Sequence, residues 1–87
     1  MPGEPRTGRG RASRERIVER AAELFADALE RMRDRGELRA DASPADMATA
    51  LLASIEGGMV LSQARKDPAS LHIAVEAGLA QVRTQLN

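Results

Sequence analysis

The sequence has no cysteine, tryptophan or tyrosine, and Phe25 is its only aromatic residue. The absence of cysteine excludes disulfide bonds and thiolate metal sites, and it fits a reducing compartment. With almost no aromatic side chains, a core must be built from aliphatic residues, alanine and methionine. In a chain of 87 residues such a core is thin. We therefore expect a partner subunit to contribute to its stability.

Long apolar runs are also missing. No stretch approaches the ~18 apolar residues of a membrane-spanning helix, and the N-terminus lacks the apolar segment of a secretory signal. We therefore expect a cytoplasmic protein that has no contact with a membrane. Histidine occurs once, at His72, which does not allow a histidine-based metal cluster. We expect neither a metal nor a cofactor.

Positive charge gathers at the N-terminus, although the formal net charge of the chain is zero. Residues 5–14, PRTGRGRASR, contain arginines and no acidic residue. Proline and glycine are frequent in residues 1–12, which predicts a disordered basic arm. Two interpretations stay open, a solvated tail or weak contacts with DNA phosphates. The phosphate contacts would come from Arg6, Arg9, Arg11 and Arg14.

The first predicted helix covers residues 13–35. Ser13 is a suitable N-cap residue, and Gly36 can adopt the left-handed conformation that ends many helices. Apolar residues follow one another at spacings of four and three, which places them on one face of this helix. These residues are Val18, Ala22, Phe25, Leu29 and Met32.

Two more helices are predicted in residues 36–87, after a connector at 36–42. Ser43-Pro44 and Asp67-Pro68 are typical helix starts, because a capping side chain precedes a proline whose missing N–H is not needed there. The turn between the two helices is very short, so they must form an antiparallel hairpin. The predicted fold is all-α, with a long N-terminal helix and a C-terminal helical hairpin.

Glycines interrupt the hairpin helices. Gly57 and Gly58 together cost roughly 1–2 kcal/mol of helix propensity. Gly58 and Gly78 continue the apolar faces of their helices, which predicts close helix–helix packing. One hairpin cannot bury two broad apolar faces, so we expect two copies to form a four-helix bundle about a twofold axis. The predicted dimer interface comprises Leu51, Ile55, Gly58, Met59, Leu71, Val75, Gly78, Leu79 and Val82.

No catalytic constellation is recognisable. His72 has Ser70 and Glu76 nearby in sequence, but three neighbours on one helix do not converge on a pocket with an oxyanion hole. The sequence also has no glycine-rich phosphate loop and no carboxylate–histidine metal spacing. We predict that the protein is not an enzyme.

Two segments resemble one known family. RERIVERAAELFA (14–26), preceded by the arginine-rich arm, resembles the first helix of the DNA-binding domain of TetR-family transcriptional repressors. From about Ala26 the chain resembles the C-terminal part of that family's regulatory domain, most tellingly in LLASIEGGMVLSQARKDPASL. The resemblance implies that the last two helices form the dimer interface. The family's helix-turn-helix and first regulatory helices are missing between the two segments, which implies an internally truncated regulator.

The resemblance implies a TetR-like regulator that retains its dimerisation part. Reading a DNA sequence needs side chains delivered to base edges, typically by a recognition helix, and that helix is absent. DNA binding should therefore be weak and non-specific at most. The expected partners are a second copy, or a full-length TetR-like protein in a heterodimer. The alternative function is a small helical-bundle interaction module without a DNA role.

Overall fold

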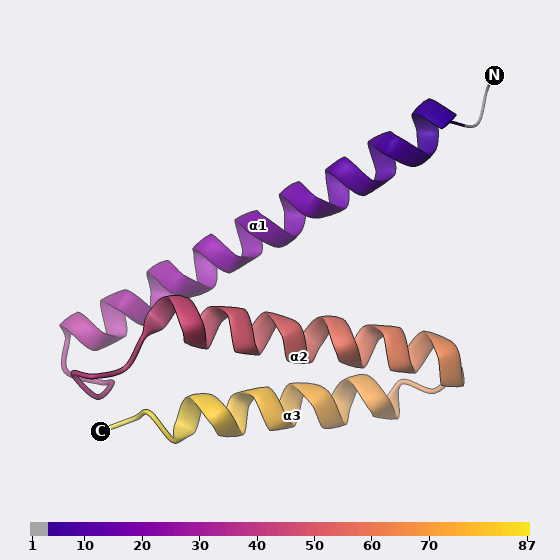
Figure 1. Cartoon of the computed structure of the whole chain (residues 1–87). Coiled ribbons are helices and arrows are strands. Elements are labelled where there is room, and N and C mark those ends of the chain that lie inside the picture. The colour runs from indigo at the N-terminus through magenta and orange to yellow at the C-terminus, as the bar shows by residue number, and fades with distance from the viewer. Residues whose placement is uncertain (1–3) are drawn as a thin grey trace.

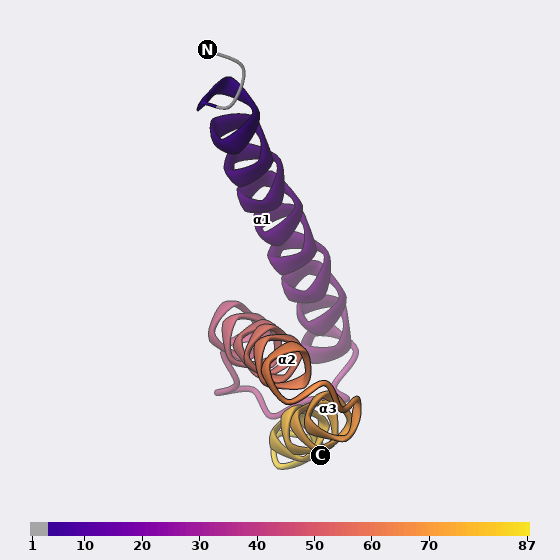
Figure 2. The same cartoon turned by 90° about the vertical axis from the view of Figure 1, so that its right-hand side faces the viewer.

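The computed structural model describes the backbone of residues 4–87 and the side chains from Ala12 onward. Its helices are α1 (Glu4–Asp34), α2 (Pro44–Arg65) and α3 (Ala69–Arg83). Helices α2 and α3 lie side by side and antiparallel, and the C-terminal half of α1 packs on α2 (Figures 1 and 2). The N-terminal half of α1 projects away from the hairpin (Figure 1). Over residues 4–87 the predicted all-α fold is confirmed, since the only β feature there is one isolated bridge between Leu38 and Leu86.

The first helix begins earlier than the sequence predicts. It starts at Glu4 and not at Ser13, so the predicted arm at 1–12 is helical from Glu4 onward, and residues 1–3 lie outside the described part of the chain. Pro5 falls in the first turn, where the missing N–H needs no partner. Arginine is among the best helix formers, which helps to offset the glycines in this segment.

The end of α1 is as predicted. Gly36 has a φ of +80°, in the left-handed region that favours glycine. The N–H of Gly36 donates to the carbonyl of Arg33 over 3.0 Å, and that of Glu37 donates to the carbonyl of Met32 over 2.9 Å. These bonds occupy carbonyl groups that would otherwise lack partners at the helix end.

The predicted start of α2 is also confirmed. The hydroxyl of Ser43 accepts a hydrogen bond from the N–H of Asp46 over 3.3 Å, and Pro44 is the first helical residue. The helix ends at Arg65, where Lys66 has a φ of 54° and its N–H donates to the carbonyl of Gln63. A lysine therefore occupies a left-handed position that glycine usually fills.

Two side chains cap α3, and the sequence predicts one of them. The Asp67 carboxylate accepts from the N–H of Ala69 over 3.0 Å, as expected. Pro68 already has helical backbone angles and accepts from His72, so the helical geometry effectively begins there. The second cap crosses the hairpin, because the hydroxyl of Ser62 in α2 accepts from the N–H of Leu71 over 2.8 Å.

The core lies where α1, the connector and the hairpin meet. Its most buried large side chain is Leu38, which is 1% exposed and comes from the connector, a segment for which the sequence predicts no core role. The predicted apolar face of α1 points into this core through Leu29. The core is as small as its composition suggests. It contains Leu29, Leu38, Ala42 and Ala48, with Phe25, Ala26, Met32, Met47 and Val82 packed around them.

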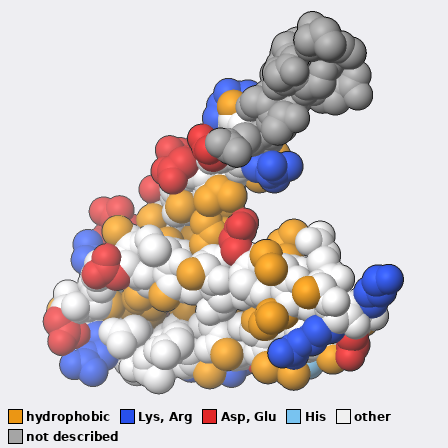
Figure 3. All heavy atoms as spheres, turned by 45° about the vertical axis from the view of Figure 1, so that its right-hand side comes forward, with side chains coloured by type: hydrophobic (Ala, Val, Ile, Leu, Met, Phe, Trp, Pro, Cys, Tyr) orange, Lys and Arg blue, Asp and Glu red, His pale blue; other side chains and the backbone are white. Residues whose placement is uncertain are grey.

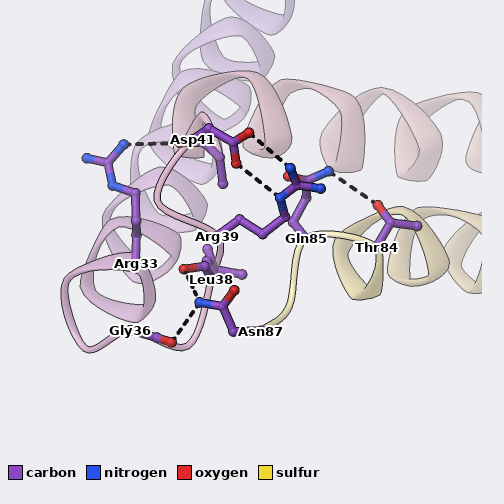
Figure 4. A network of polar contacts seen from close by, with 9 residues as sticks. Arg33, Gly36, Leu38, Arg39, Asp41, Thr84, Gln85 and Asn87 are labelled. Atoms are coloured by element: carbon purple, nitrogen blue, oxygen red, sulfur yellow. Dashed lines mark hydrogen bonds and ion pairs between the residues drawn. The ribbon is translucent and has the colours of Figure 1, made fainter.

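The C-terminal residues fasten the connector in place (Figure 4). The side-chain amide of Asn87 donates to the carbonyls of Gly36 and Leu38 over 2.9 and 2.8 Å. The backbone N–H of Arg39 donates to the carbonyl of Gln85 over 2.9 Å. These bonds satisfy the polar backbone on both sides of Leu38, so that its side chain can be buried.

Candidate dimerisation surface

Close contact between α2 and α3 depends on two glycines. A Cβ atom on Gly58 would lie 2.6 Å from the Cβ of Ala74 and 3.1 Å from the Cα of Leu71. A Cβ atom on Gly78 would lie 2.9 Å from a methyl of Leu51. The predicted packing role of both glycines is confirmed, and it joins α2 to α3 within one chain.

The other predicted interface residues divide into two groups. Met59 and Leu79 are exposed. The remaining residues are half-buried and, like the two buried glycines, belong largely to the contact between α2 and α3 within one chain. They are Leu51, Ile55, Leu71, Val75 and Val82. The pairing of two copies through this set stays a prediction.

A different face of the hairpin is open to a second copy. On α2, exposed residues follow at helical spacing, and a Cβ on Gly57 would meet nothing within 4 Å. On α3, exposed Ile73, Ala77 and Gln81 share a row, and Gln81 lines a shallow groove together with Ala50 of α2. We call this surface the hairpin face. Its members are Ala50, Ala53, Gly57, Leu61, Ile73 and Ala77.

The hairpin face is missing from the predicted interface. Its signal in the sequence is a row of small residues on α2 at spacings of three and four, which places them on one side of the helix. Such a row lets another backbone approach closely, because alanine and glycine carry little or no side chain. The larger apolar residues of α2 predict an interface on its other sides, which α3 and α1 already cover.

An open groove lies between α1 and α2, with a volume of about 950 Å³. Ile17 and Val18 of α1 and Met59 and Val60 of α2 form its apolar walls. Figure 3 shows apolar side chains along the middle of α1, above the hollow that separates this helix from the hairpin. The groove is open to solvent, so these residues are accessible to another helix.

The predicted phosphate-binding residues fall on the N-terminal part of α1. Arg14 is exposed and lines the groove beside Glu15 and Glu19. The side chains of Arg6, Arg9 and Arg11 lie outside the described residues. Contact of these arginines with DNA stays a prediction.

Residues with catalytic potential do not converge. Ser70 is 7% exposed, and its hydroxyl accepts from the guanidinium of Arg65 over 3.1 Å. His72 and Glu76 are exposed, whereas the Ser70 side chain is buried. Among the side chains that the structure describes, no group of three histidine or acidic residues could hold a metal ion. Within the same part of the chain, no helix is both long and apolar enough to cross a membrane.

Comparison with known families decides the relationship. The model described as "Tetracyclin repressor-like, C-terminal domain" matches residues 4–78. The chain belongs to this family. The family assignment made from the sequence is thereby confirmed for the C-terminal domain of a TetR-like protein. No match was found among curated proteins or among solved structures.

The matched span bears on the N-terminal helix. It includes residues 14–26, which resemble the first helix of a TetR DNA-binding domain, and it counts them within the TetR-like C-terminal domain. Helix α1 continues through the boundary near Ala26 without interruption. The internal truncation stays a prediction.

Proposed function

We propose that this chain is the dimerisation part of a TetR-like transcriptional regulator, and that it does not read a DNA sequence by itself. The observation that carries the proposal is the hairpin face, an exposed and largely apolar surface on helices α2 and α3 of a chain whose residues 4–78 match a TetR-like C-terminal domain. A regulatory role through pairing, without catalysis, fits this surface. Such a regulator would act in the cytoplasm.

The physical basis of pairing is the burial of apolar surface. Two hairpins that join their hairpin faces make a four-helix bundle about a twofold axis. Ala53 and Gly57 would let the helices of the two copies approach closely. The thin core of the single chain gives such pairing a large share in stability, because each Å² of apolar surface removed from water contributes roughly 25 cal/mol.

Helix geometry supports the proposal that the chain does not read a DNA sequence by itself. In a helix-turn-helix, two helices cross at about 90–120° so that the second enters the major groove. Helices α2 and α3 instead run antiparallel and in contact along their length (Figure 1). We expect at most weak binding to DNA through the N-terminal arginines, which should fall steeply as salt rises.

The origin of α1 has two possible explanations. The resemblance of residues 14–26 to a DNA-binding domain supports an internally truncated regulator. The family match over residues 4–78 supports α1 as a continuous part of the C-terminal domain. Reading the genomic DNA across codons 24–30 would decide whether a deletion joins two segments there.

Pairing with a full-length relative would give the chain a regulatory effect. A TetR-like dimer needs two recognition helices for its two half-sites. A heterodimer with this chain would contain only one, so mixing the two proteins should lower operator affinity. Unchanged affinity in a mixture shown to contain heterodimers would contradict this part of the proposal.

Light scattering across a dilution series tests the proposed pairing. We expect the native protein to have more than the mass of a single chain and Ala53→Glu, which places a charge on the hairpin face, to have a clearly lower mass than the native protein. The matched control is His72→Glu, an exposed position of α3 outside that face. A native protein that stays monomeric at micromolar concentration would refute the proposal.

The DNA affinity of the N-terminal arginines distinguishes the proposed regulator from the alternative, an interaction module without a DNA role. A regulator relative should lose its residual DNA affinity when Arg6, Arg9 and Arg11 are replaced by alanine. A plain helical module would show no affinity to lose.

A further inference from the structure

Helix α1 carries a second row of apolar residues that α2 does not cover. The row comprises Ile17, Ala21, Leu24 and Ala28, at spacings of four, three and four. Ile17 is 68% exposed and Leu24 is 51% exposed. At 3.6 residues per turn the row lies about a quarter turn around the helix from Val18 and Phe25, which face α2. We call this row the α1 seam.

The seam needs a cover for physical reasons. The N-terminal half of α1 projects beyond the hairpin (Figure 1). Ile17 lines the open groove between α1 and α2. A helix in water gains most of its stability from packing an apolar face, not from its own hydrogen bonds. The spacing of the seam is that of helices packed in a coiled coil, which makes another helix the natural cover.

The charges beside the seam identify the covering helix. Arg20 precedes Ala21 and Asp27 precedes Ala28, so both lie at the same flanking position of the repeat, on either side of Leu24. When two such helices pair antiparallel, like flanking positions face each other. With Leu24 at the centre, Arg20 of one copy lies opposite Asp27 of the other, and the reverse pair forms as well. A parallel arrangement would instead set identical charges at the same height.

The neighbouring charges are compatible with this arrangement. Within the chain Arg20 lies 3.2 Å from Glu23, but this pair is exposed and therefore weak, so Arg20 can turn to another acid. In the antiparallel arrangement Arg31, one turn beyond Ala28, would lie opposite Ile17 of the second copy. Its aliphatic stem can cover that isoleucine while its guanidinium stays in water.

We propose that the α1 seam is a self-association surface on which two copies of this chain pair antiparallel, with Leu24 at the twofold axis and Arg20 of each copy facing Asp27 of the other. The C-terminal half of one α1, which carries its own hairpin, then lies beside the overhanging N-terminal half of the other. This arrangement covers Ile17 in both copies. It uses no residue of the hairpin face and holds whether or not that face pairs.

Site-specific cross-linking of the full chain tests the arrangement. The sequence has no cysteine, so a single Leu24→Cys substitution gives one reactive thiol per chain. A short bismaleimide should join Leu24→Cys chains into covalent dimers. The matched control is Glu30→Cys, also exposed on α1 but outside the seam, which should cross-link far less at the same concentration. Equal yields from the two variants would mean random collision and would overturn the proposal.

Charge exchange provides the second test, in the Leu24→Cys background. Arg20→Asp or Asp27→Arg alone sets like charges opposite each other in both pairs, and each should weaken association roughly tenfold at low salt. The double variant restores opposite charges and should recover the cross-linking yield. A double variant as weak as the single variants, with unchanged helix content by circular dichroism, would refute the antiparallel register.

The proposals for the hairpin face and for the α1 seam can be refuted independently. Ala53→Glu should abolish pairing through the hairpin face and leave cross-linking at Leu24→Cys intact. Loss of the Leu24→Cys cross-link in Ala53→Glu would show that the seam is not an independent surface, and would overturn this inference without touching the proposed function.

Discussion

At the scale of single residues, the two adjacent glycines of α2 have opposite roles. Gly58 lies against α3, where a Cβ would come within 2.6 Å of Ala74 and 3.1 Å of the backbone of Leu71. Gly57 faces open space. The same substitution at these neighbouring positions therefore separates helix packing from helix propensity.

Gly58→Ala should destabilise the protein by about 1–3 kcal/mol, because the helices must move apart to admit the methyl group. In the Ala53→Glu background, where the hairpin face does not pair, Gly57→Ala should stabilise the protein by up to about 1 kcal/mol through helix propensity. Urea unfolding of both variants at one protein concentration measures the difference. A stabilised Gly58→Ala would show that α2 and α3 do not approach as closely as described.

Also at the residue scale, an exposed ion pair lowers the pKa of a carboxyl group in the connector. The guanidinium of Arg35 donates to the Glu37 carboxylate over 3.0 and 3.2 Å, and this hydrogen bonding lowers the pKa of Glu37. A lowered pKa means that the pair contributes to stability above the ordinary carboxyl pKa. That contribution is lost as pH falls through the folded-state pKa. Because both groups are exposed to solvent, the effect on stability is small.

An NMR titration of the Glu37 side-chain carboxyl carbon should give a midpoint below the ordinary value for glutamate. Arg35→Gln should raise that midpoint towards the ordinary value, since it removes the cationic donor. Arg39→Gln, which breaks the neighbouring pair with Asp41, serves as the control and should leave Glu37 unchanged. Identical midpoints in the native chain and Arg35→Gln would contradict the described pair.

At the scale of the elements, caps determine where the helices end. Ser43, Asp67 and Gly36 act at the positions that their residue types predict. Lys66 is the exception, because its φ of 54° places a side chain in a conformation that costs roughly 1–2 kcal/mol relative to a right-handed one. The hairpin turn therefore contains strain that a glycine would remove.

Lys66→Gly should raise the free energy of unfolding by up to about 1 kcal/mol, with the flexibility of glycine in the unfolded chain limiting the gain. Gln63→Gly, one turn earlier inside α2, should lower it by about 1 kcal/mol. Thermal melts of the two variants compare them directly. Destabilisation by both substitutions would mean that Lys66 is not strained.

The elements also show how far the sequence predicts this protein. The helices of the hairpin and the close approach at Gly58 and Gly78 follow from local signals, namely caps and apolar spacing. The burial of Leu38 does not, because it depends on a hydrogen bond that the Gln85 carbonyl accepts and on others that Asn87 donates, both far away in the chain. The early start of α1 does not follow from the sequence either, because glycine and proline usually break helices, although Pro5 occupies the one turn that tolerates it.

The candidate surface is predicted less well than the fold. Helical spacing identifies which residues share a face, but it does not reveal which neighbour covers that face. The sequence therefore assigns Gly58 and Gly78 to a dimer interface, while the structure uses them between α2 and α3. Only the three-dimensional arrangement shows that the small residues around Gly57 remain exposed.

At the scale of the whole molecule, folding and association should be coupled. The buried core among the described residues is small, with Leu38 as its one large side chain under 2% exposed, while Ile17, Leu24, Val60 and Ile73 stay exposed. A partner that binds only the folded chain raises its stability by mass action. The melting temperature of the native protein should therefore rise by several degrees for each tenfold increase in protein concentration.

Circular dichroism melts over a hundredfold range of concentration measure this coupling. The double variant Ala53→Glu/Leu24→Arg carries a charge on each proposed surface, and its melting temperature should not depend on concentration. A native protein whose melting temperature is equally insensitive would show that the single chain is stable alone.

The two glycine contacts of the hairpin also govern how it can move. Each helix offers a notch to the other, since Ala74 sits over Gly58 and Leu51 sits over Gly78. Sliding α3 along α2 by one turn, about 5.4 Å, would withdraw both side chains from their notches at once. These contacts therefore resist sliding of α3 along α2, but they do not resist rotation of the two helices as one rigid body. A displacement of either helix would move both together, and the hairpin face would turn with them.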